Sequence, residues 1–577
     1  MGTDFKRTFL AGAAVLFILL IAPYYLQLIG YQDSQEIVNE EPPSEIKTLN
    51  APIDKNKPIQ NIDIDRASVS DVQRFSFNIV SSKYLATINN LGGGSFEKYE
   101  LINGGKQLQG GYDSQGSYND SIDVNLMFNN ERLCAPCVGV QEKGQQTILS
   151  EPFQLISIKV NNRPINNTKS VVLGEQDSCT VSLGLTKDNY RVIKNTTFFG
   201  NSYQTQHIAN IQTMNNSFNQ EGLSLVWDKG IKNTEKNLYD EITAYAAAYI
   251  SINKETQDLW YNPGTLQDEA ESIKATGPIE WAAIRNKYFI MAMIPEFASS
   301  AFLDAVPYQL NHKNIVPSYI ASISAGGVST LSSTIYFGPL DIDYIHELDS
   351  SLDRIMNFGW YIIQPFSRGV LWLLKSMHSF GINYGIILIL FAFLVRIITG
   401  PLTKKAFLSS QKMQTIQPQL QKLQTKYKND SQRLNQEMVK LYKESGVNPL
   451  GGCLPMLMQM PLLLSLFLVF RSTIEFRGAP FFGWISNLSQ PDTVFYLPFS
   501  VPIYGDQVAL LPILLGVSMF LSQRVSMSSM DPKQKPVMYI MSAFFFLLFN
   551  SFPSGLNLYY LVYNFLNYFQ QKSLKKA

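Results

Sequence analysis

Six stretches of the chain consist almost entirely of apolar residues, and five of them lie in its last third. They are Phe9–Ile29, Tyr384–Leu402, Cys453–Phe470, Val508–Gln523, Val537–Phe552 and Leu556–Phe569. A bilayer core about 30 Å thick is crossed by about 20 helical residues. The pattern therefore predicts six transmembrane helices, and the shortness of some runs favours a thinned bilayer or a water-filled cavity around them.

The first apolar run follows Lys6 and Arg7 and allows two interpretations. A cleavable signal peptide has a positively charged start, but this run is long for a signal core and no small-residue cleavage site follows it. Tyr24 and Tyr25 fit the aromatic belt of a membrane interface instead. We therefore expect residues 1–30 to form a retained transmembrane anchor.

Between the anchor and the other apolar runs the pattern changes to short alternating stretches. Residues 31–60 are polar, acidic and proline-rich, which indicates a flexible linker. Residues 61–350 contain alternating runs broken by Asn, Gly and Ser, such as Phe75–Val80, Tyr84–Ile88, Ile156–Val160, Val181–Leu185 and Tyr203–Ile211. This pattern predicts a large antiparallel β-sandwich. Its Trp227, Trp260 and Trp281 could belong either to the core or to a ligand platform.

Residues 351–380 mix apolar and aromatic side chains with Arg368 and Lys375, which predicts an amphipathic helix on the outer membrane surface. The remaining residues, 381–577, would form a five-helix core. Its cytoplasmic hairpin, 403–448, should contain two short helices that pair in antiparallel, since apolar residues recur there at heptad spacing. A turn and a helix N-cap are expected at Lys428–Ser431.

Lysine and arginine predict the orientation of these segments. The hairpin is strongly basic, and its cations include Lys404, Lys405, Lys412, Lys422, Lys426 and Arg433. Because cytoplasmic loops carry the excess of positive charge, both termini should be cytoplasmic and the β-sandwich should lie outside. The basic hairpin would contact either anionic lipid headgroups or ribosomal RNA or a targeting factor.

The net charge is +1 over 577 residues. The few cysteines and histidines indicate no site for a cofactor or metal. Cys134 and Cys137 have the spacing of a redox pair. No helical pattern follows them, so a local disulfide is the better interpretation if the segment is extracytoplasmic. The four histidines lack metal-ligand spacing, and no nucleotide-binding loop is present. We therefore expect no metal, no cofactor and no enzymatic activity.

Arg396 is the one charged residue within its apolar run, about 18 Å from the run's outer end at 1.5 Å per residue. None of the six runs contains Asp or Glu. The arginine either snorkels to the cytoplasmic face or faces a water-filled cavity, where its counter-charge would arrive with a client protein. The absence of intramembrane carboxylates argues against the hypothesis that the protein is an ion-coupled transporter.

Further polar residues interrupt the apolar runs. Gln459 lies in the third run, and Asn557, Tyr559 and Tyr560 lie in the last. Each alone could serve helix packing. Together with Arg396 they indicate a hydrophilic groove that opens to the cytoplasm.

The sequence at these positions resembles the YidC family of membrane insertases. The resemblance rests on Phe337-Gly-Pro, Asn357-Phe-Gly-Trp360, Val395-Arg396, Pro401-Leu-Thr403, Val447-Asn-Pro-Leu-Gly-Gly-Cys453-Leu-Pro455, Gln459-Met-Pro461 and Phe552-Pro-Ser-Gly-Leu-Asn-Leu-Tyr-Tyr560. It implies that Arg396 attracts acidic or polar stretches of incoming proteins, with Gln459, Tyr559 and Tyr560 along the same groove. It also implies a hydrophobic client path formed by Met460, Leu463, Leu548 and Phe552. Three positions depart from the family's pattern, namely Ala392, Gly400 and Ser551.

The resemblance further implies a periplasmic β-sandwich at a Gram-negative inner membrane. The expected partners are nascent membrane proteins, the Sec translocon, the ribosome, the signal-recognition-particle receptor and membrane lipids, with no small-molecule substrate. The favoured hypothesis is an insertase and chaperone. Two alternatives are a small-solute transporter, which would need internal repeats or paired charges, and a periplasmic glycan-binding module on a membrane anchor.

Overall fold

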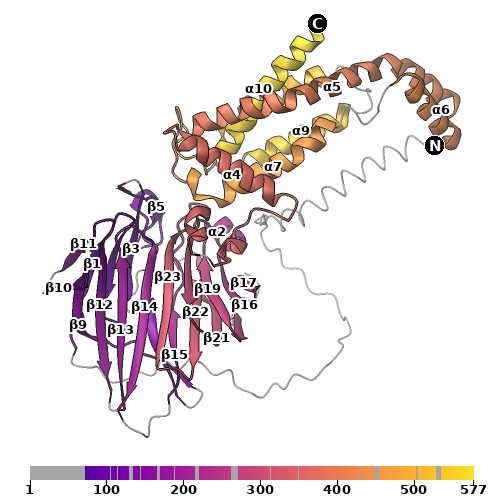
Figure 1. Ribbon diagram of the computed structural model, residues 1–577. Helices are drawn as coiled ribbons and strands as arrows, with labels where there is room; N and C mark the ends of the chain where they lie inside the picture. The colour runs from indigo at the N-terminus through magenta and orange to yellow at the C-terminus, as the bar shows by residue number, and fades with distance from the viewer. Residues whose placement is uncertain are drawn as a thin grey trace. The chain divides into compact units, whose positions relative to one another are not determined.

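The computed structural model describes residues 72–576, apart from 104, 114, 129–133, 143–144, 166–168, 188, 215–219, 261–270, 312–313, 349, 429, 447–453, 502–503 and 528–534. The described chain forms two compact units, one ending at Asp353 and one beginning at Arg354. The first is built mainly of strands and the second mainly of helices (Figure 1). The predicted anchor and linker, residues 1–30 and 31–60, lie outside the described residues.

Three sheets make up the β unit. The largest runs in the order β10 (Arg163–Ile165), β9 (Gln154–Val160), β12 (Ser178–Thr186), β13 (Tyr190–Phe199), β14 (Gln204–Thr213), β23 (Thr330–Pro339), β20 (Phe289–Pro295), β19 (Ile279–Arg285), β16 (Ala247–Ile252) and β17 (Glu255–Trp260). The second runs β18 (Glu271–Thr276), β21 (Ser300–Gln309), β22 (Ile315–Gly326), β15 (Gln220–Trp227), β7 (Cys137–Glu142) and β8 (Gln145–Ile148). The third runs β11 (Ser170–Val172), β1 (Ser76–Val80), β2 (Tyr84–Asn89), β3 (Ser95–Asn103) and β4 (Lys106–Gln107).

Smaller elements complete this unit. They are the hairpin β5 (Gln109–Tyr112) and β6 (Tyr118–Asp123), the helices α2 (Leu238–Ala244) and α3 (Ile342–His346), and the 3-10 turn η1 (Leu352–Ile355), which crosses into the next unit. Among the described strands, paired neighbours run antiparallel except β1 and β11, which are parallel. The predicted antiparallel β architecture is confirmed. Each of the five predicted strands overlaps one of β1, β2, β9, β12 and β14, and none extends more than one residue beyond it.

The core of the β unit contains aromatic side chains from all three sheets. Phe96 and Tyr99 come from β3, Trp227 from β15 and Phe337 from β23. The ring centroids of Tyr99 and Phe337 are 4.4 Å apart, and those of Trp227 and Phe337 are 4.9 Å apart. The Tyr99 hydroxyl donates a 2.8 Å hydrogen bond to the carbonyl of Phe337, which satisfies its buried polar atom. Trp227 is therefore a core residue rather than a ligand platform.

The helical unit contains seven described α-helices. They are α4 (Gln364–His378), α5 (Tyr384–Lys426), α6 (Ser431–Glu444), α7 (Leu454–Ser472), α8 (Leu510–Met527), α9 (Lys535–Phe549) and α10 (Ser554–Lys576). Between α7 and α8 lie the 3-10 turn η2 (Ile474–Phe476) and the hairpin β24 (Thr493–Val501) and β25 (Gly505–Ala509). Helix α10 packs against both α5 and α8, while α4 packs against α7 and α5.

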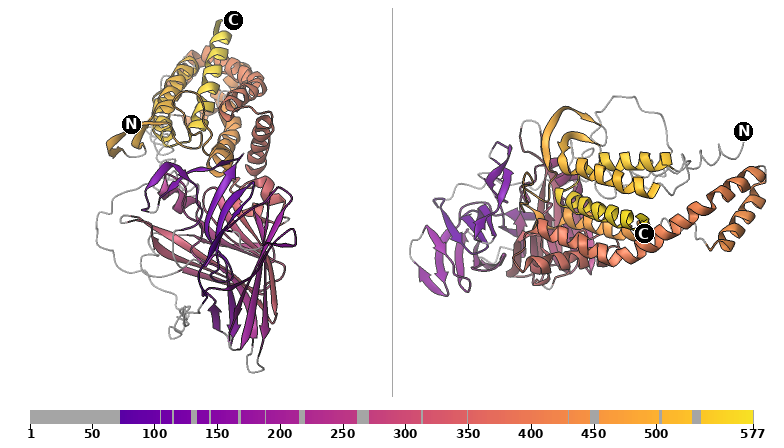
Figure 2. Two further views of the ribbon diagram at one scale, coloured as in Figure 1. Left: turned by 90° about the vertical axis from the view of Figure 1, so that its left-hand side faces the viewer. Right: turned by 90° about the horizontal axis from the view of Figure 1, so that it is seen from above.

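Helix α5 is longer than the sequence pattern suggested. We expected a span ending near Leu402 and then two short hairpin helices, but the span and the first hairpin helix form one helix of 43 residues. Pro401 and Pro418 lie inside it without ending it. Seen from above, α5 extends beyond the other helices before the chain turns back as α6 (Figure 2).

The turn into α6 has the predicted chemistry. The Asp430 side chain caps α6 by accepting a 3.0 Å hydrogen bond from the Arg433 backbone N–H. Ile416 and Leu420 of α5 are buried against Met438 and Leu441 of α6. The two helices of the hairpin therefore pack through the apolar positions that the heptad spacing identified.

Only some of the six predicted spans correspond to described helices that are long enough to cross a membrane. Among the described residues, the stretch Tyr384–Met413 of α5 is long and apolar enough to cross a bilayer, and Gln459–Ser472 and Leu510–Arg524 form shorter apolar helices. Helix α9 has only 15 residues, and α10 carries Asn, Gln and Tyr along its length. The number of six spans stays a prediction.

Helix α4 occupies the middle of the segment predicted as a surface helix. Its Val370, Leu371 and Leu374 are buried, whereas Phe366 and Trp372 are exposed on the outside of the unit. Lys375 forms a 3.1 Å ion pair with Glu475, which follows α7. The helix is therefore fixed to the bundle on one face and presents large apolar side chains on the other, as an interfacial helix would.

Candidate functional site

Arg396 lies on α5, twelve residues after the first residue of the helix, and its side chain is only 8% exposed. Its neighbours Ile397 and Ile398 point outward and are 75% and 67% exposed. The arginine is thus on the inner side of α5, between this helix and α10. Its guanidinium extends to Gln570, which follows the last apolar run, so both a snorkelling arginine and a cavity-facing one stay possible interpretations.

The guanidinium of Arg396 contacts neutral side chains. Its Nη2 donates a hydrogen bond to the Oε1 of Gln570 on α10, and its central carbon lies 5.6 Å from the ring centroid of Tyr563. Its Nε and Nη1 atoms are buried and have no hydrogen-bond partner in the described part of the chain. A buried cation normally requires an ion pair or full hydrogen bonding. The positive charge of Arg396 is therefore oriented but not neutralised.

Gln570 connects this arginine to the backbone of α5. While its Oε1 accepts from Arg396, its Nε2 donates a 3.3 Å hydrogen bond to the carbonyl of Gly400. A Cβ atom at position 400 would lie 3.4 Å from that Nε2 atom, close to the limit of ordinary packing. An alanine at position 400 would therefore fit beside Gln570 without displacing it.

Tyr559 and Tyr560 extend the site along α10 toward its first turn. The Tyr559 ring stacks 6.0 Å from Tyr563 and lies 4.9 Å from Tyr560, and on α5 it contacts Phe391 at 5.6 Å. The hydroxyls of Tyr559 and Tyr560 are buried and lack a described hydrogen-bond partner. We call this row of polar groups between α5 and α10, from Tyr559 through Tyr563 and Arg396 to Gln570, the polar seam.

Asn557 lies near these residues in sequence but serves the turn between α9 and α10. It is fully buried, and its Nδ2 donates hydrogen bonds to the carbonyls of Phe549 (3.1 Å) and Phe552 (3.3 Å). Its amide therefore ties the end of α9 to the start of α10. We expected Asn557 to line a groove, whereas its donor atoms are used in this local contact.

The other predicted groove and path residues are not gathered at Arg396. Gln459 is half-buried on α7, and it is not among the described hydrogen-bond partners of Arg396. Met460 on the same helix is 43% exposed. Leu463 on α7, Leu548 on α9 and Phe552 after α9 are each half-buried. Helix α7 meets the end of α9 where the rings of Phe467 and Phe552 lie 4.9 Å apart.

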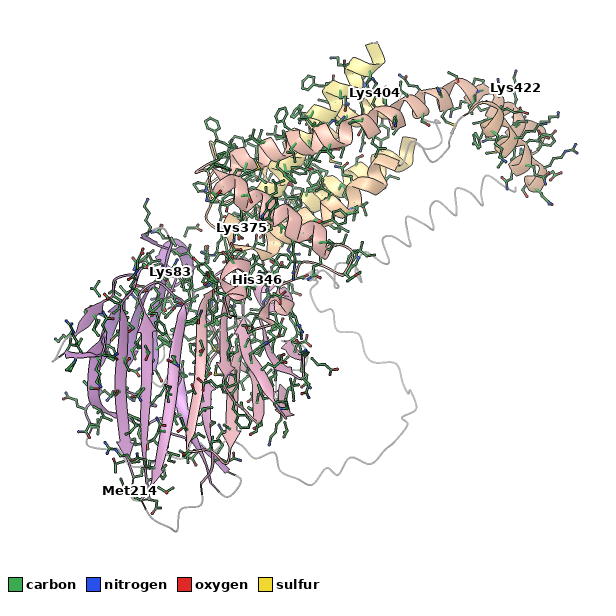
Figure 3. The ribbon with its side chains drawn as sticks, in the orientation of Figure 1. Lys83, Met214, His346, Lys375, Lys404 and Lys422 are labelled. Carbon is green, nitrogen blue, oxygen red and sulfur yellow. A yellow bond between two sulfur atoms is a disulfide. The ribbon has the colours of Figure 1, made fainter. Side chains whose placement is uncertain are left out.

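The predicted basic residues lie on the surface of the hairpin. Lys404, Lys405, Lys412, Lys422 and Lys426 on α5 and Arg433 on α6 are all exposed. Lys404 and Lys422 mark the extended part of α5 in Figure 3. Lys426 and Arg433 lie 5.3 Å and 5.5 Å from the ring centroid of Tyr427, at the tip of the hairpin. This exposed positive surface can contact a polyanion without desolvating a buried charge.

In the β unit, Cys134 and Cys137 are joined by a disulfide, and Cys179 is a free, buried cysteine. Lys194 is buried beside the loop that carries this disulfide. Its Nζ donates to the carbonyls of Pro136 (2.7 Å) and Gly94 (3.2 Å). Burial lowers the pKa of Lys194 to about 7. Within the described ranges, no group of three or more His, Cys, Asp or Glu side chains could hold a metal ion.

Comparison with known proteins assigns both units to one class of inner membrane protein. Residues 375–577 match the family model described as 60Kd inner membrane protein, and residues 154–373 match the YidC periplasmic domain. The chain is 36% identical over 417 residues to the membrane protein insertase YidC of Chlorobium phaeovibrioides, covering 70% of each chain. It is 37% identical over 469 residues to that of Chlorobaculum tepidum, covering 79% of this chain and 78% of the relative. The chain belongs to the YidC family of membrane protein insertases, whose matched members are named as insertases and not as enzymes.

Among solved structures, the chain is similar to an active YidC insertase crystal structure with its first transmembrane domain resolved. The two are 18% identical, with a TM-score of 0.32, and the match covers 85% of this chain and 92% of the other. Membership of the family rests on the sequence relatives and not on this structural likeness.

Residues Tyr563 and Gln570 were not predicted as part of the site. Gln570 follows the last apolar run by one residue and so falls outside the hydrophobic pattern. Tyr563 lies one helical turn after Tyr559 and Tyr560, and that spacing is the signal that could have identified it. Both meet Arg396 only because α10 packs along α5, which no local pattern reveals.

Proposed function

We propose that the chain receives hydrophobic segments of nascent proteins at the polar seam and releases them into the inner membrane, acting as an insertase and chaperone. The observation that carries this proposal is the buried guanidinium of Arg396, which is held by neutral Gln570 and Tyr563. A charge fixed without a counter-ion attracts an acidic or polar stretch of an incoming chain more strongly than one already paired. The client would supply the missing negative charge.

The membrane orientation is part of the same proposal. We infer six spans, with both termini and the basic hairpin in the cytoplasm and the β unit in the periplasm, because positive residues favour the cytoplasmic side. The outer ends of α5 and α10 would then lie at Tyr384 and Ser554. Arg396 would be about 18 Å below the outer end of α5, which leaves this residue nearer to the cytoplasmic side.

The apolar part of a client would leave through the space between α7 and α9. Met460 and Leu463 on α7, with Leu548 and Phe552 at the end of α9, offer half-exposed apolar side chains along this route. The chain segments approach each other at the rings of Phe467 and Phe552, so the client would pass between α7 and α9 on the cytoplasmic side of that contact. Gln459, one residue before Met460, would supply a polar group at the entrance.

The exposed basic face of the hairpin would contact the ribosome, the signal-recognition-particle receptor or anionic lipid headgroups. Among the described residues of the hairpin, Lys440 and Glu444 of α6 form an exposed ion pair at 4.0 Å, which leaves the surface strongly positive. Phosphate contacts dominate the affinity of proteins for nucleic acids. We also infer cooperation with the Sec translocon, which rests on membership of the family.

The test replaces Arg396 by Ala and by Lys in the full-length protein, reconstituted in vesicles with two single-span clients. One client carries an acidic external tail and the other an otherwise identical tail of Asn and Gln. Arg396→Ala should lower insertion of the acidic client about tenfold, equivalent to about 1.4 kcal/mol, with a smaller loss for the neutral client. Arg396→Lys should retain most insertion. Normal insertion of the acidic client by both variants would show that the charge does not act on the client.

A further inference from the structure

The hairpin of β24 and β25 carries an unusual surface. Val494, Phe495, Tyr496 and Phe499 are between 53% and 63% exposed. Successive residues of a strand point to opposite faces, so both faces of this two-stranded ribbon expose apolar side chains. A ribbon of two strands has no core of its own and is at best marginally stable in water. The exposed apolar surface of Val494, Phe495 and Phe499 would be stabilised by contact with an apolar environment outside the described chain.

The hairpin is almost free of charged residues, which favours an apolar environment over a charged partner. From Thr493 to Ala509 the sequence contains one charged residue, Asp506. The preceding loop adds Phe482, which is 82% exposed, and Trp484, which is about half exposed. Tryptophan and tyrosine side chains are enriched at the level of lipid headgroups, where their rings lie between the apolar core and water.

The base of the hairpin is fixed to the ends of two helices. The Oδ2 atom of Asp492 accepts hydrogen bonds from the Trp484 indole (2.9 Å) and from the backbone N–H of Leu511 in the first turn of α8 (2.7 Å). Asn550, the residue after α9, accepts from the backbone N–H of Ala509 (3.0 Å). These bonds hold the ribbon at the ends of α8 and α9 instead of leaving it on a free loop.

The hairpin also turns back along α9. The Nδ2 of Asn550 donates to the carbonyls of Tyr504 (2.8 Å) and Gln507 (2.5 Å). The Tyr504 ring lies 6.1 Å from Phe546, which is about one turn inside α9. The ribbon thus continues the apolar surface of the helices, where Val517 and Phe520 of α8 are also exposed. Figure 2 shows this orange hairpin projecting sideways from the helices.

We propose that the β24–β25 hairpin lies in the outer leaflet of the membrane, with Val494, Phe495, Tyr496 and Phe499 in contact with lipid. This inference rests on the proposed orientation of α8 and α9. It gives the protein a fixed contact with lipid on the side from which client tails emerge. Such a contact displaces lipid at the outer ends of α8 and α9 and favours the local thinning that short helices require.

The test uses nitroxide spin labels on the full-length protein carrying Cys453→Ser, reconstituted in vesicles of phosphatidylethanolamine and phosphatidylglycerol. Labels are attached in separate variants at Phe499→Cys, at Asp506→Cys, at Val517→Cys as the reference within α8, and at Met214→Cys as the reference on the β unit (Figure 3). Each label's collision rates with oxygen, which concentrates in lipid, and with a water-soluble nickel complex are compared. Phe499 should resemble Val517, with oxygen collisions dominant, and Asp506 should be shifted toward Met214.

Three other outcomes overturn the inference. Water-like collisions at Phe499, with lipid-like collisions at Val517, would place the hairpin in the periplasm while leaving the proposed span intact. Water-like collisions at both positions would show that α8 does not cross the bilayer, which would refute the proposed spans and with them the proposed function. Protection of Phe499 from both reagents would show that protein, and not lipid, covers the hairpin.

Discussion

Gln570 and Arg396 face each other between α10 and α5, and a neutral side chain thereby donates no counter-charge to a buried cation of the helical unit. The same side chain also donates to the carbonyl of Gly400, one turn further along α5. Gln570 thus fixes the direction of the guanidinium without cancelling its charge. This distinguishes the arrangement from a structural salt bridge, in which the charge would be satisfied permanently.

Replacing Gln570 by Glu should convert this contact into an ion pair. A carboxylate at the position of Oε1 would neutralise Arg396 and compete with the acidic tail of a client. We expect insertion of an acidic-tailed client to fall to the level of Arg396→Ala, about tenfold below wild type, a difference of about 1.4 kcal/mol. Protease protection of the client in reconstituted vesicles measures the effect.

Gln570→Ala is the matched control, because it removes the same contact but leaves the positive charge in place. It should retain most insertion activity. Equal activity of Gln570→Glu and wild type would contradict a role for an unneutralised charge, whereas equal loss in both variants would assign the effect to the position of Arg396.

Removing charge from the hairpin should weaken ribosome binding. The triple variant Lys412→Gln, Lys422→Gln and Lys426→Gln removes three exposed cations from α5. Each lost phosphate contact reduces the slope of log affinity against log salt by roughly 0.7, so the slope should fall by about 2. Cosedimentation of the detergent-solubilised protein with empty ribosomes over a salt series gives this slope.

A control with the same loss of charge replaces three exposed lysines of the β unit, Lys106, Lys169 and Lys274, by Gln. Its salt slope should match wild type. An unchanged slope in the hairpin variant would assign these lysines to lipid headgroups or solvent.

Lys194 should make the stability of the β unit depend on pH. Burial lowers its pKa to about 7 in the folded chain, against 10.5 in an unfolded one. Between these values the unfolded state binds more protons, so the free energy of unfolding rises with pH, by at most about 1.4 kcal/mol per unit. The stabilisation is therefore lost as the pH falls toward 7. Lys194→Met should remove this slope.

Urea unfolding followed by tryptophan fluorescence between pH 7 and 9.5 checks this expectation, since Trp227 and Trp281 are fully buried in the β unit. The difference between variant and wild type is the relevant quantity. Burial raises the pKa of Glu241 to about 8, and that group contributes an opposite slope to both proteins. Burial and Lys194 hold the pKa of His207 well below 6.5, so it remains neutral in this range. Parallel stability curves for the two proteins would refute the prediction.

Replacing Gly92 by Ala should destabilise the β unit more than replacing Gly105, whose backbone geometry is similar. Its φ is +60°, and a Cβ atom there would overlap the Sγ of Cys137 and lie 3.2 Å from the Cys137 Cα. Gly105 has φ +79°, but a Cβ atom at that position would have no other atom within 4 Å. Both Ala variants incur the left-handed backbone cost of about 1–2 kcal/mol. Gly92→Ala should lose about 1–3 kcal/mol more through overpacking, and similar unfolding midpoints in urea would argue against this.

Local pattern was sufficient for much of the fold. Alternating apolar residues identified strands such as β2 and β14, because one face of each strand is buried and the other is not. The turn at Asp430 was predicted from a capping residue before a helical pattern. By contrast, the continuity of α5 through Pro401 was not expected. Helical residues follow Pro401 without interruption, and packing against α10 and α6 outweighs the loss of one backbone hydrogen bond.

A site residue was predictable only where its own sequence neighbourhood made it unusual. Arg396 was identified because a charge within an apolar run is costly, which makes that residue a candidate for a functional role. Gln570 was missed because its role depends on a contact across 174 positions of sequence. Asn557 was expected to face a groove, but an amide next to a helix end is equally suited to bind free carbonyls, and here it binds those of Phe549 and Phe552.

The unbroken length of α5 joins two events that would otherwise be separate. A helix of 43 residues measures about 65 Å. The hairpin tip proposed to contact a ribosome and Arg396, proposed to contact a client, therefore belong to one continuous helix. A movement of the hairpin would therefore be transmitted along α5 to the contact between Arg396 and Gln570. Under the proposed function, binding of a translating ribosome at the tip would thus change the hydrogen bond between Gln570 and Arg396 mechanically, with no separate signal.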